Sequence, residues 1–341
     1  MHRSELTIDL GALRRNVRTL LRALEGAQLW AVVKADAYGH GAFDVAGAAL
    51  GSGAQALCVV TVAEALELRR EFTDARILCM GPPGSSRDIA EARDANVELA
   101  VSDAELPEGV RVHLKLDTGM GRYGLTEIVQ PTRSVVGLMS HLATADSNAS
   151  FAHEQIARFA DLVRPYRAAL TCHIANSAAA LRIPEAHFDA ARCGIALYGL
   201  SPFMDDPAVD GLEPVLRWHS RLAQVKQLQA GESTGYGRRF VADRPTWIGL
   251  VPVGYADGFR RDLSGTEVRV AGEPCKVVGT VSMDSFAVEL DRELPVATPV
   301  TLVGHGVLAE NHAKVAGTIN YELVSRINTD PRRTRRTVVD A

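Results

Sequence analysis

The feature that most constrains the fold is a regular alternation of short apolar runs and helix-like segments before residue 201. Short apolar runs bounded by turn formers are typical of buried strands, and apolar residues at three-to-four spacing are typical of helices. The expected strands comprise residues 29–33, 56–60, 76–80, 97–101, 110–116, 135–139, 170–174 and 188–197. The first expected helix follows Asp9, which is its expected cap. Further helices are expected at 42–50, 62–71, 85–95, near Glu127, at 151–168 and from Ser177 onward. About eight such βα units predict a TIM-type (β/α)8 barrel.

The composition changes in residues 201–214, which are rich in Pro, Asp and Gly and therefore indicate a domain boundary. Beyond them, strands are expected at 218–229, 246–253, 267–270, 276–281, 286–290 and 299–303, with one helix at 309–316. The sequence therefore predicts an α/β barrel domain over residues 8–212. A mostly β domain over 213–341 is expected to follow, with residues 1–7 as a candidate additional strand.

Composition excludes several classes of protein. A net charge of -4 argues against a nucleic-acid partner, and the basic run at 332–336 is interpreted as a solvated tail or a set of local ion pairs. Five cysteines without CxxC spacing predict reduced thiols and no metal site. The N-terminus lacks an apolar targeting segment, and no run is long enough to span a membrane. We expect a cytoplasmic protein that does not bind membranes.

Lys34 ends the apolar run 29–33 and is followed by small residues and the glycines Gly39 and Gly41. The carboxyl ends of barrel strands carry the chemistry of such folds. A lysine partly removed from water has a lowered amine pKa, which suits a Schiff-base former or a general base. A lysine whose stem merely packs at a strand end is an equally good interpretation of this run alone.

Residues 31–41, Ala-Val-Val-Lys-Ala-Asp-Ala-Tyr-Gly-His-Gly, resemble the lysine segment of bacterial alanine racemases. The resemblance continues in the same order through nearly the whole chain. It implies that Lys34 carries pyridoxal 5′-phosphate (PLP) on its amine. It also implies a homodimer in which the barrel of one chain and the C-terminal domain of its partner complete each site.

The loops after the seventh and eighth expected strands are where TIM barrels often hold phosphate. Ser177 begins a helix whose free N–H groups suit an anion, and Gly194 allows close approach of backbone, although a serine there can also be a simple cap. The resemblance implies that Ser177, Gly194 and Ile195 bind the PLP phosphate together with the tyrosines Tyr38 and Tyr321.

The resemblance places Arg192 against the pyridine nitrogen of PLP, where most PLP enzymes have a carboxylate. An arginine keeps its proton, so this nitrogen stays neutral and side reactions such as transamination are suppressed. His141 matches the family histidine that orients this arginine. Without the surrounding matches, Arg192 would be interpreted as a structural ion pair and His141 as a core histidine.

Two cations lie at the end of the expected strand 110–116 and in the loop after it. Arg122 matches the family arginine that contacts the phenolic oxygen of PLP and the substrate carboxylate, roles that suit a planar charged fork. Lys115 matches a lysine that is often carbamylated in the family, a change that would let it pair with Arg122.

In the C-terminal domain, Tyr236 between Gly235 and Gly237 matches the second acid/base of the family, although the bare motif is typical of a hairpin or bulge. Tyr255 matches a tyrosine that lines the substrate route, and Met283 with Asp284 matches the pair beside the substrate carboxylate. No metal ligand is implied.

The reaction implied by the resemblance is interconversion of L-alanine and D-alanine, with Lys34 serving D-alanine and Tyr236 serving L-alanine. D-Alanine for cell-wall peptidoglycan is the implied purpose. A racemase of serine or of a broader range of amino acids remains an alternative. A non-catalytic PLP carrier would lack the second domain, and a PLP decarboxylase would have an acidic residue in place of Arg192.

Overall fold

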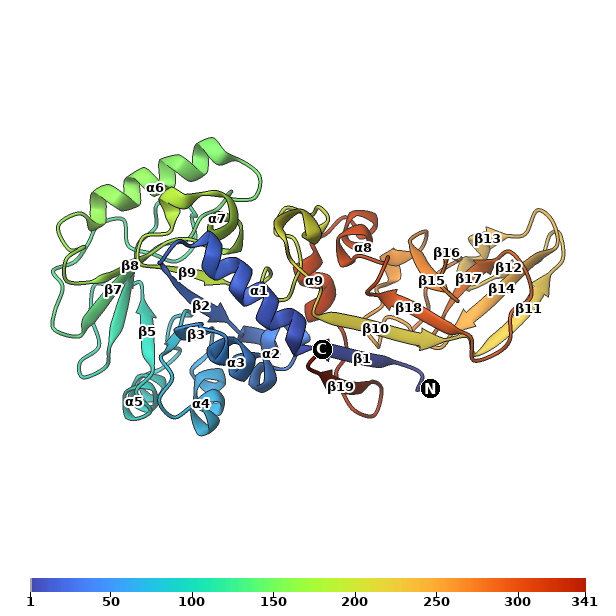
Figure 1. Ribbon diagram of the computed structural model, residues 1–341, viewed down its shortest axis with the longest axis horizontal. Helices are drawn as coiled ribbons and strands as arrows, with labels where there is room; N and C mark the ends of the chain where they lie inside the picture. The colour runs from blue at the N-terminus through green and yellow to red at the C-terminus, as the bar shows by residue number, and fades with distance from the viewer. Residues whose placement is uncertain (1) are drawn as a thin grey trace. The chain divides into compact units, whose positions relative to one another are not determined.

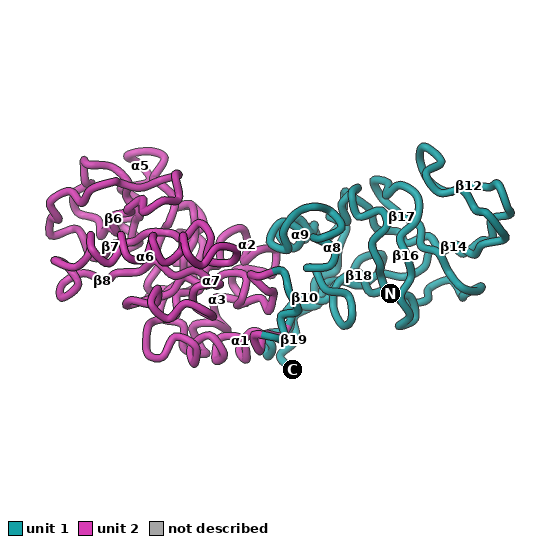
Figure 2. The backbone as a smooth tube through the Cα atoms, turned by 90° about the horizontal axis from the view of Figure 1, so that it is seen from above, with its two compact units in different colours: residues 1–12, 204–209, 214–341 teal, residues 13–203, 210–213 magenta. Residues whose placement is uncertain are grey.

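The computed structural model describes residues 2–341, which divide into two compact units (Figure 2). The barrel unit comprises Leu13–Phe203 with Asp210–Glu213, and the remaining described residues form the second unit.

The barrel unit is built on eight parallel strands. They are β2 (Gln28–Val32), β3 (Ala56–Val59), β4 (Ile77–Cys79), β5 (Glu98–Val101), β6 (Val112–Lys115), β7 (Val135–Met139), β8 (Thr171–His173) and β9 (Ala190–Cys193). Their order is β8-β7-β6-β5-β4-β3-β2-β9, and backbone hydrogen bonds from Asp189 to Cys172 and from Arg192 to Ala175 bring β9 back to β8. The strands are almost wholly buried, as parallel strands covered on both sides must be. The predicted barrel is confirmed.

Helices surround these strands (Figure 1). They are α1 (Leu10–Ala23), α2 (Lys34–Gly39), α3 (Ala42–Gly51), α4 (Val62–Glu71), α5 (Ser86–Asp94), α6 (Ala149–Val163) and α7 (Ser177–Arg182). Local capping sets where they start. Asp9 accepts a hydrogen bond from the Ala12 N–H, as predicted, and Thr61 forms a capping box with Glu64 at the start of α4.

The helix predicted near Glu127 is wrong, because residues 116–134 contain no helix in the structure. Gly119, Gly121 and Gly124 precede Glu127 with positive φ angles, and Pro131 follows it, so too few residues remain between these breakers to form helical turns. Within the described chain, no helix follows β5 or β6, so the βα alternation is interrupted there.

The second unit is mostly β, as predicted. Its nine-stranded sheet has the order β11-β14-β17-β16-β15-β18-β10-β1-β19, and β12 (Ser233–Thr234) pairs with β13 (Phe240–Val241). The sheet strands are β1 (Glu5–Asp9), β10 (Leu216–Arg221), β11 (Gln224–Leu228), β14 (Thr246–Val251), β15 (Glu267–Val270), β16 (Glu273–Val278), β17 (Phe286–Leu290), β18 (Pro299–Val303) and β19 (Arg335–Val339). Two helices, α8 (Ala309–Ala316) and α9 (Asn320–Ser325), complete it.

Two sequence expectations about the second unit change. The single strand expected at 218–229 is two strands, β10 and β11, interrupted at Leu222 and Ala223. The basic run at 332–336 is not simply a solvated tail, because Arg335 and Arg336 begin β19, which pairs in parallel with β1. The ion pairs expected there are present, since Arg332 pairs with Asp330.

All five cysteines are free thiols. None of the helices formed by residues 2–341 is both long enough and apolar enough to span a bilayer.

Candidate active site

Lys34 lies two residues beyond the carboxyl end of β2, near the strand end that the sequence predicted, and it begins α2. The next four residues, Ala35 to Tyr38, all have φ angles of 51–56°, so α2 is a left-handed turn. This conformation costs roughly 1–2 kcal/mol per residue for L-amino acids and needs support from its surroundings. Ala35 donates to Glu64 Oε1 at 2.7 Å, and Asp36 Oδ1 accepts from the Ala42 N–H at 2.7 Å. The backbone after Lys34 is therefore fixed at both ends.

The Lys34 amine lies in a cationic, partly dry environment. Burial first and the charge of Arg122 second lower its pKa, and the carboxylate of Glu64 opposes them. The neutral amine is therefore more accessible near neutral pH than in an exposed lysine, which is the form that acts as a nucleophile or a base.

Arg192 is a buried cation near the carboxyl end of β9, only 4% exposed. Its guanidinium donates to His173 Nδ1 at 2.5 Å, to the Ser140 carbonyl at 2.6 Å and to the His173 carbonyl at 3.1 Å. Burial lowers its pKa to about 10, so it stays charged at neutral pH. The His141 Nδ1 lies 3.4 Å from the same guanidinium, so the structure brings these two residues together.

Lys115 ends β6 and is 8% exposed. Burial, followed by the charges of Arg122, Arg192 and Lys34, lowers its pKa to about 8. These four cations therefore act on one another at one end of the barrel. Burial and the same cations, Arg192 first, lower the pKa of His141 to about 3 and keep it neutral. The region is strongly electropositive and suits an anionic ligand.

Ser177, Gly194 and Tyr38 also lie together. The cap of α7 is Asn176, which accepts from the Ala179 N–H, so Ser177 is the first helical residue and not the cap. Its hydroxyl instead accepts from the Gly194 N–H at 3.0 Å. A Cβ atom at Gly194 would lie 2.5 Å from Tyr38 Oη, so only glycine fits there. Ile195, the next residue, is fully buried.

The predicted residues of the second unit are more exposed. Tyr236 is 73% exposed and is held through its backbone carbonyl, which accepts from Thr280 Oγ1 at 2.9 Å. Tyr255 and Met283, 43% and 53% exposed, lie on adjoining loops, because the Tyr255 N–H donates to the Ser282 carbonyl at 3.1 Å. Asp284 forms an ion pair with Arg333 at 2.6 Å, and Tyr321 lies half-buried in α9.

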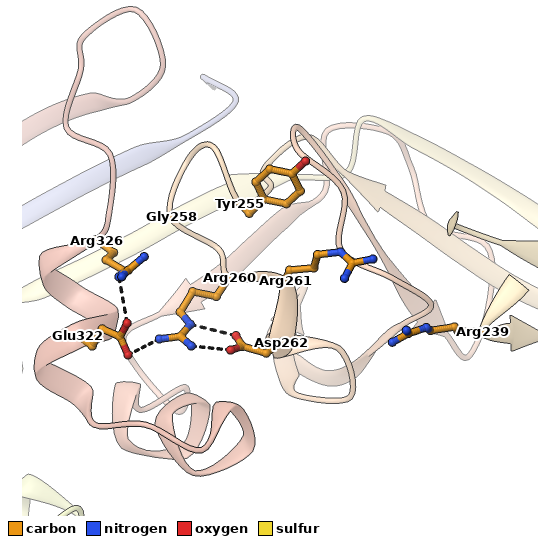
Figure 3. Close-up of a pocket in the computed structure, with 8 residues that line it drawn as sticks. All are labelled: Arg239, Tyr255, Gly258, Arg260, Arg261, Asp262, Glu322 and Arg326. Carbon is orange, nitrogen blue, oxygen red and sulfur yellow. Dashed lines mark hydrogen bonds and ion pairs between the residues drawn. The ribbon is translucent and has the colours of Figure 1, made fainter. Parts of the chain in front are cut away.

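Tyr255 also lines a pocket of about 610 Å³ in the second unit (Figure 3). Arg260 bonds both Asp262 and Glu322 there, and Arg326 pairs with Glu322 at 3.1 Å. Arg239 and Arg261 also line the pocket, and Figure 3 marks no ion pair between either of them and the other lining residues. Four guanidinium groups against two carboxylates give this pocket a net positive charge.

Sequence reasoning missed the polar residues that surround Arg192, above all His173, His113 and Glu98. One pattern could have drawn attention to His113: it lies two residues before Lys115 in β6, and residues two apart in a strand point to the same face. Among the described residues, no cluster of His, Cys, Asp or Glu could hold a metal ion.

Two family models match this chain: the N-terminal domain of alanine racemase over residues 8–202 and its C-terminal domain over residues 215–336. The chain belongs to the alanine racemase family. "Alanine racemase 1" of Bacillus subtilis (strain 168) is 40% identical over 94% of this chain and 90% of its own length. The alanine racemase of Geobacillus kaustophilus (strain HTA426) is also 40% identical, over 93% of this chain and 90% of its own length.

Solved alanine racemases share the fold. The enzyme from D-cycloserine-producing Streptomyces lavendulae superposes with a TM-score of 0.90 at 36% identity, covering 100% of this chain and 98% of its own. The biosynthetic enzyme of Pseudomonas aeruginosa gives a TM-score of 0.92 at 35% identity, covering 99% of this chain and 100% of its own. Membership of the alanine racemase family makes this chain an amino-acid racemase, an isomerase of the PLP-dependent class.

Proposed function

We propose that this chain interconverts L-alanine and D-alanine with PLP bound at the carboxyl end of its barrel, moving the α-proton with two bases, Lys34 and Tyr236. The observation that carries the proposal is the convergence of Lys34, Arg122, Lys115 and Arg192, whose charges act on one another. Such a cluster needs an anion to balance it, and PLP with an amino-acid carboxylate supplies one.

The phosphate end of the cofactor fits the group formed by Ser177, Gly194 and Tyr38. Because Gly194 has no side chain, Tyr38 Oη can lie against its backbone, where a Cβ would collide with the phenol. Hydroxyl and backbone N–H donors are the groups that bind phosphate without an extra buried charge. Ile195 and Tyr321 complete this set in the proposal.

The pyridine end fits Arg192, whose guanidinium is held by His173 and the Ser140 carbonyl. Because this cation keeps its proton, it would donate to the pyridine nitrogen and leave that nitrogen unprotonated. His141 would support Arg192, since its ring nitrogen lies 3.4 Å from the guanidinium. When bound, PLP withdraws electrons from the substrate α-carbon and makes the α-proton acidic.

Lys34 would then take or return that proton at Nζ on one face of the substrate. Burial and Arg122 lower its pKa, so that the amine is a better match to neutral pH. Removal of a proton on one face and its return on the opposite face inverts the α-carbon. We assign Lys34 to D-alanine and Tyr236 to L-alanine, the roles that the resemblance to alanine racemases implies.

Tyr236 would act at Oη on the other face. Its side chain is 73% exposed, and a phenol must lose its proton to act as a base, which a cationic surface around it would favour. We propose that a partner subunit supplies this surface, in a homodimer where the barrel of one chain and the second unit of the other form each site. Tyr255, Met283 and Asp284 would hold the substrate from the same unit.

Arg122 would bind the substrate carboxylate, for which its planar fork is suited. Lys115 would carry a carbamate, formed when its neutral amine adds CO₂ and releases one proton. A pKa of about 8 makes that neutral amine available at physiological pH, and the product anion would pair with Arg122. D-Alanine made in the cytoplasm would supply peptidoglycan synthesis, with no nucleic acid as a partner.

Borohydride reduction tests the cofactor site. Treatment of the purified protein with PLP and borohydride should fix the cofactor to the Lys34 amine, as read by peptide mass spectrometry. In parallel, a panel of single enantiomers of alanine, serine and larger amino acids should show conversion that is fastest for alanine. An adduct on another lysine, or no conversion of any enantiomer, would overturn the proposal.

A further inference from the structure

A continuous line of buried polar side chains leads away from Arg192 through the barrel. Arg192 donates to His173 Nδ1 at 2.5 Å, His173 Nε2 lies 2.8 Å from His113 Nδ1, and His113 Nε2 lies 2.9 Å from Glu98 Oε2. The four residues come from β9, β8, β6 and β5 and are between 0% and 4% exposed. Glu98 is the first residue of β5 and Arg192 the third of β9, so the line runs from the amino toward the carboxyl ends of the strands.

The chemistry of the two ends fixes the direction of every hydrogen bond. A guanidinium can only donate and an ionised carboxylate can only accept. Burial lowers the pKa of both His113 and His173, so each imidazole is neutral and has one donor and one acceptor nitrogen. Arg192 therefore donates to His173 Nδ1, His173 Nε2–H donates to His113 Nδ1, and His113 Nε2–H donates to Glu98. Only one pair of tautomers satisfies all three bonds.

The barrel provides space for this line at the expense of apolar packing. A Cβ at Gly137 in β7 would lie 2.2 Å from His113 Nδ1, so the glycine leaves room for the imidazole. The Trp30 ring packs against both imidazoles, with ring centroids 5.7 Å from that of His113 and 4.5 Å from that of His173. Barrel interiors are ordinarily filled with layers of branched apolar residues, and buried polar groups are costly unless fully bonded.

The far end of the line is anchored by charge. Arg76 donates to the same Glu98 oxygen at 2.8 Å and stacks 4.4 Å from the Trp30 ring centre. Burial alone would raise the pKa of Glu98, but the hydrogen bonds from His113 and Arg76 and the charge of Arg76 lower it to about 2. Glu98 is therefore a permanent acceptor. Arg111 approaches the other oxygen of Glu98 at 3.4 Å from a half-exposed position and is not part of the line.

We propose that Glu98 is a positioning residue for the racemase reaction: through His113 and His173 it fixes the tautomer that faces Arg192 and so holds the guanidinium in one orientation. This role rests on the proposed function, in which Arg192 bonds the pyridine nitrogen of PLP. Glu98 itself touches neither cofactor nor substrate. Its effect reaches the site through the two imidazoles. If both changed tautomer, the Nδ1–H of His173 would face an N–H of Arg192, and two donors would then oppose each other.

The first test needs no variant. Nitrogen-15 NMR of protein with labelled histidines reports which ring nitrogen carries the proton, and the resonances can be assigned with single His113→Asn and His173→Asn variants. Both His113 and His173 should be neutral with the proton on Nε2, with and without PLP. A charged His113, or a proton on Nδ1 of either ring, would overturn the proposal.

The second test compares Glu98→Gln with the control Arg111→Gln. A glutamine amide can donate as well as accept, so Glu98→Gln should give mixed tautomers at His113 and a shifted absorption band of bound PLP. It should also lower kcat by about tenfold, as loss of a group that orients a ligand does, with the KM for alanine within about twofold. Arg111→Gln should match the unaltered protein in all four measurements. A folded Glu98→Gln protein with unchanged tautomers and kcat would overturn the role of Glu98.

Failure of the proposed function gives a different result. If the unaltered protein neither binds PLP nor converts alanine, the proposed function is wrong, and with it the catalytic role of Glu98. The tautomers measured without PLP then decide separately whether the line of hydrogen bonds exists.

Discussion

The candidate residues of the barrel unit and those of the second unit differ in how they are held. In the barrel, Lys115 and Arg192 are at most 8% exposed, and Arg192 is held by hydrogen bonds to His173 of β8 and to the Ser140 carbonyl that follows β7. In the second unit, Tyr236, Met283 and Tyr255 are 73%, 53% and 43% exposed, and Tyr236 is held through its backbone.

The difference shows two ways in which a side chain can be prepared for catalysis: by its own unit, or by a second surface that covers it. Burial and neighbouring cations already lower the pKa values of Lys34 and Lys115 within the barrel unit. An exposed phenol has no such environment of its own and must gain it from another surface. The barrel unit thus carries a prepared half-site, and the second unit carries groups that a proposed partner barrel completes.

The largest effect is expected at Lys34 itself. Lys34→Ala removes both the point of attachment for PLP and one base, so kcat should fall by at least about 10⁴-fold for both enantiomers. Enantiomer conversion followed by chiral chromatography measures this, and Lys226→Ala, an exposed lysine of β11, is the control. Substantial activity in Lys34→Ala would contradict the assignment of the prepared half-site to the barrel unit.

Tyr236→Phe should have a one-sided effect. Exchange of the α-proton of L-alanine with solvent should fall by about 10²–10⁴-fold, because the phenol that serves this face is lost. Exchange of D-alanine should remain measurable, since Lys34 still reaches the other face. Proton NMR in deuterated water follows both enantiomers. Equal loss for both would remove the separation of roles between the two units.

Lys115→Met should stabilise the protein in buffer free of CO₂. The pKa of Lys115 is lowered to about 8 from an ordinary value of 10.5, so the unfolded chain binds more protons between these pH values. The loss in free energy of unfolding that the buried charge causes is therefore fully present below about pH 8 and disappears as pH rises toward 10.5. Thermal unfolding should show Tm raised by a few degrees at pH 7 and by less at pH 10. An equal gain at both pH values would contradict burial of a charged Lys115.

The smallest effect is expected at Asp284. Its ion pair with Arg333 is exposed on the Asp284 side, so Asp284→Asn should cost less than about 1 kcal/mol in urea unfolding. Asp257→Asn is the matched comparison, because Asp257 is fully buried and accepts from Arg3, Arg333 and the Gly254 N–H. That change should cost several kcal/mol, about 3 or more. If both substitutions lowered the free energy of unfolding equally, Asp284 would not be the weaker of the two partners of Arg333.

Apolar periodicity predicted the barrel strands well, because burial on both faces leaves continuous apolar runs such as those of β2 and β3. It could not predict the left-handed turn Ala35–Tyr38, whose residues have no intrinsic preference for positive φ and depend on Glu64 and Ala42. It also missed β19, which contains the charged residues Arg335 and Arg336. An edge strand tolerates such charges, but in the sequence they look the same as the charges of a solvated tail.

For the candidate site, sequence motifs and the resemblance that they carry supplied Lys34, Arg192 and Ser177. The line from Arg192 to Glu98 was not predictable in this way. Its members lie in four strands separated by up to 94 positions, from Glu98 to Arg192, and only the barrel topology brings them together. The hydroxyl of Ser177 depends on topology in the same way, since it accepts from the Gly194 N–H, which lies 17 positions later in the chain.

Mixing two inactive variants tests most directly whether the prepared half-site and Tyr236 come from different chains. Lys34→Ala and Tyr236→Phe protomers, refolded together in equal amounts, should pair at random, so about half of the dimers are mixed. In a mixed dimer one site carries both changes and the other carries neither, so about a quarter of unaltered activity should return. If gel filtration confirms exchange of protomers and the mixture stays as inactive as its parents, both bases come from one chain and the shared site is wrong.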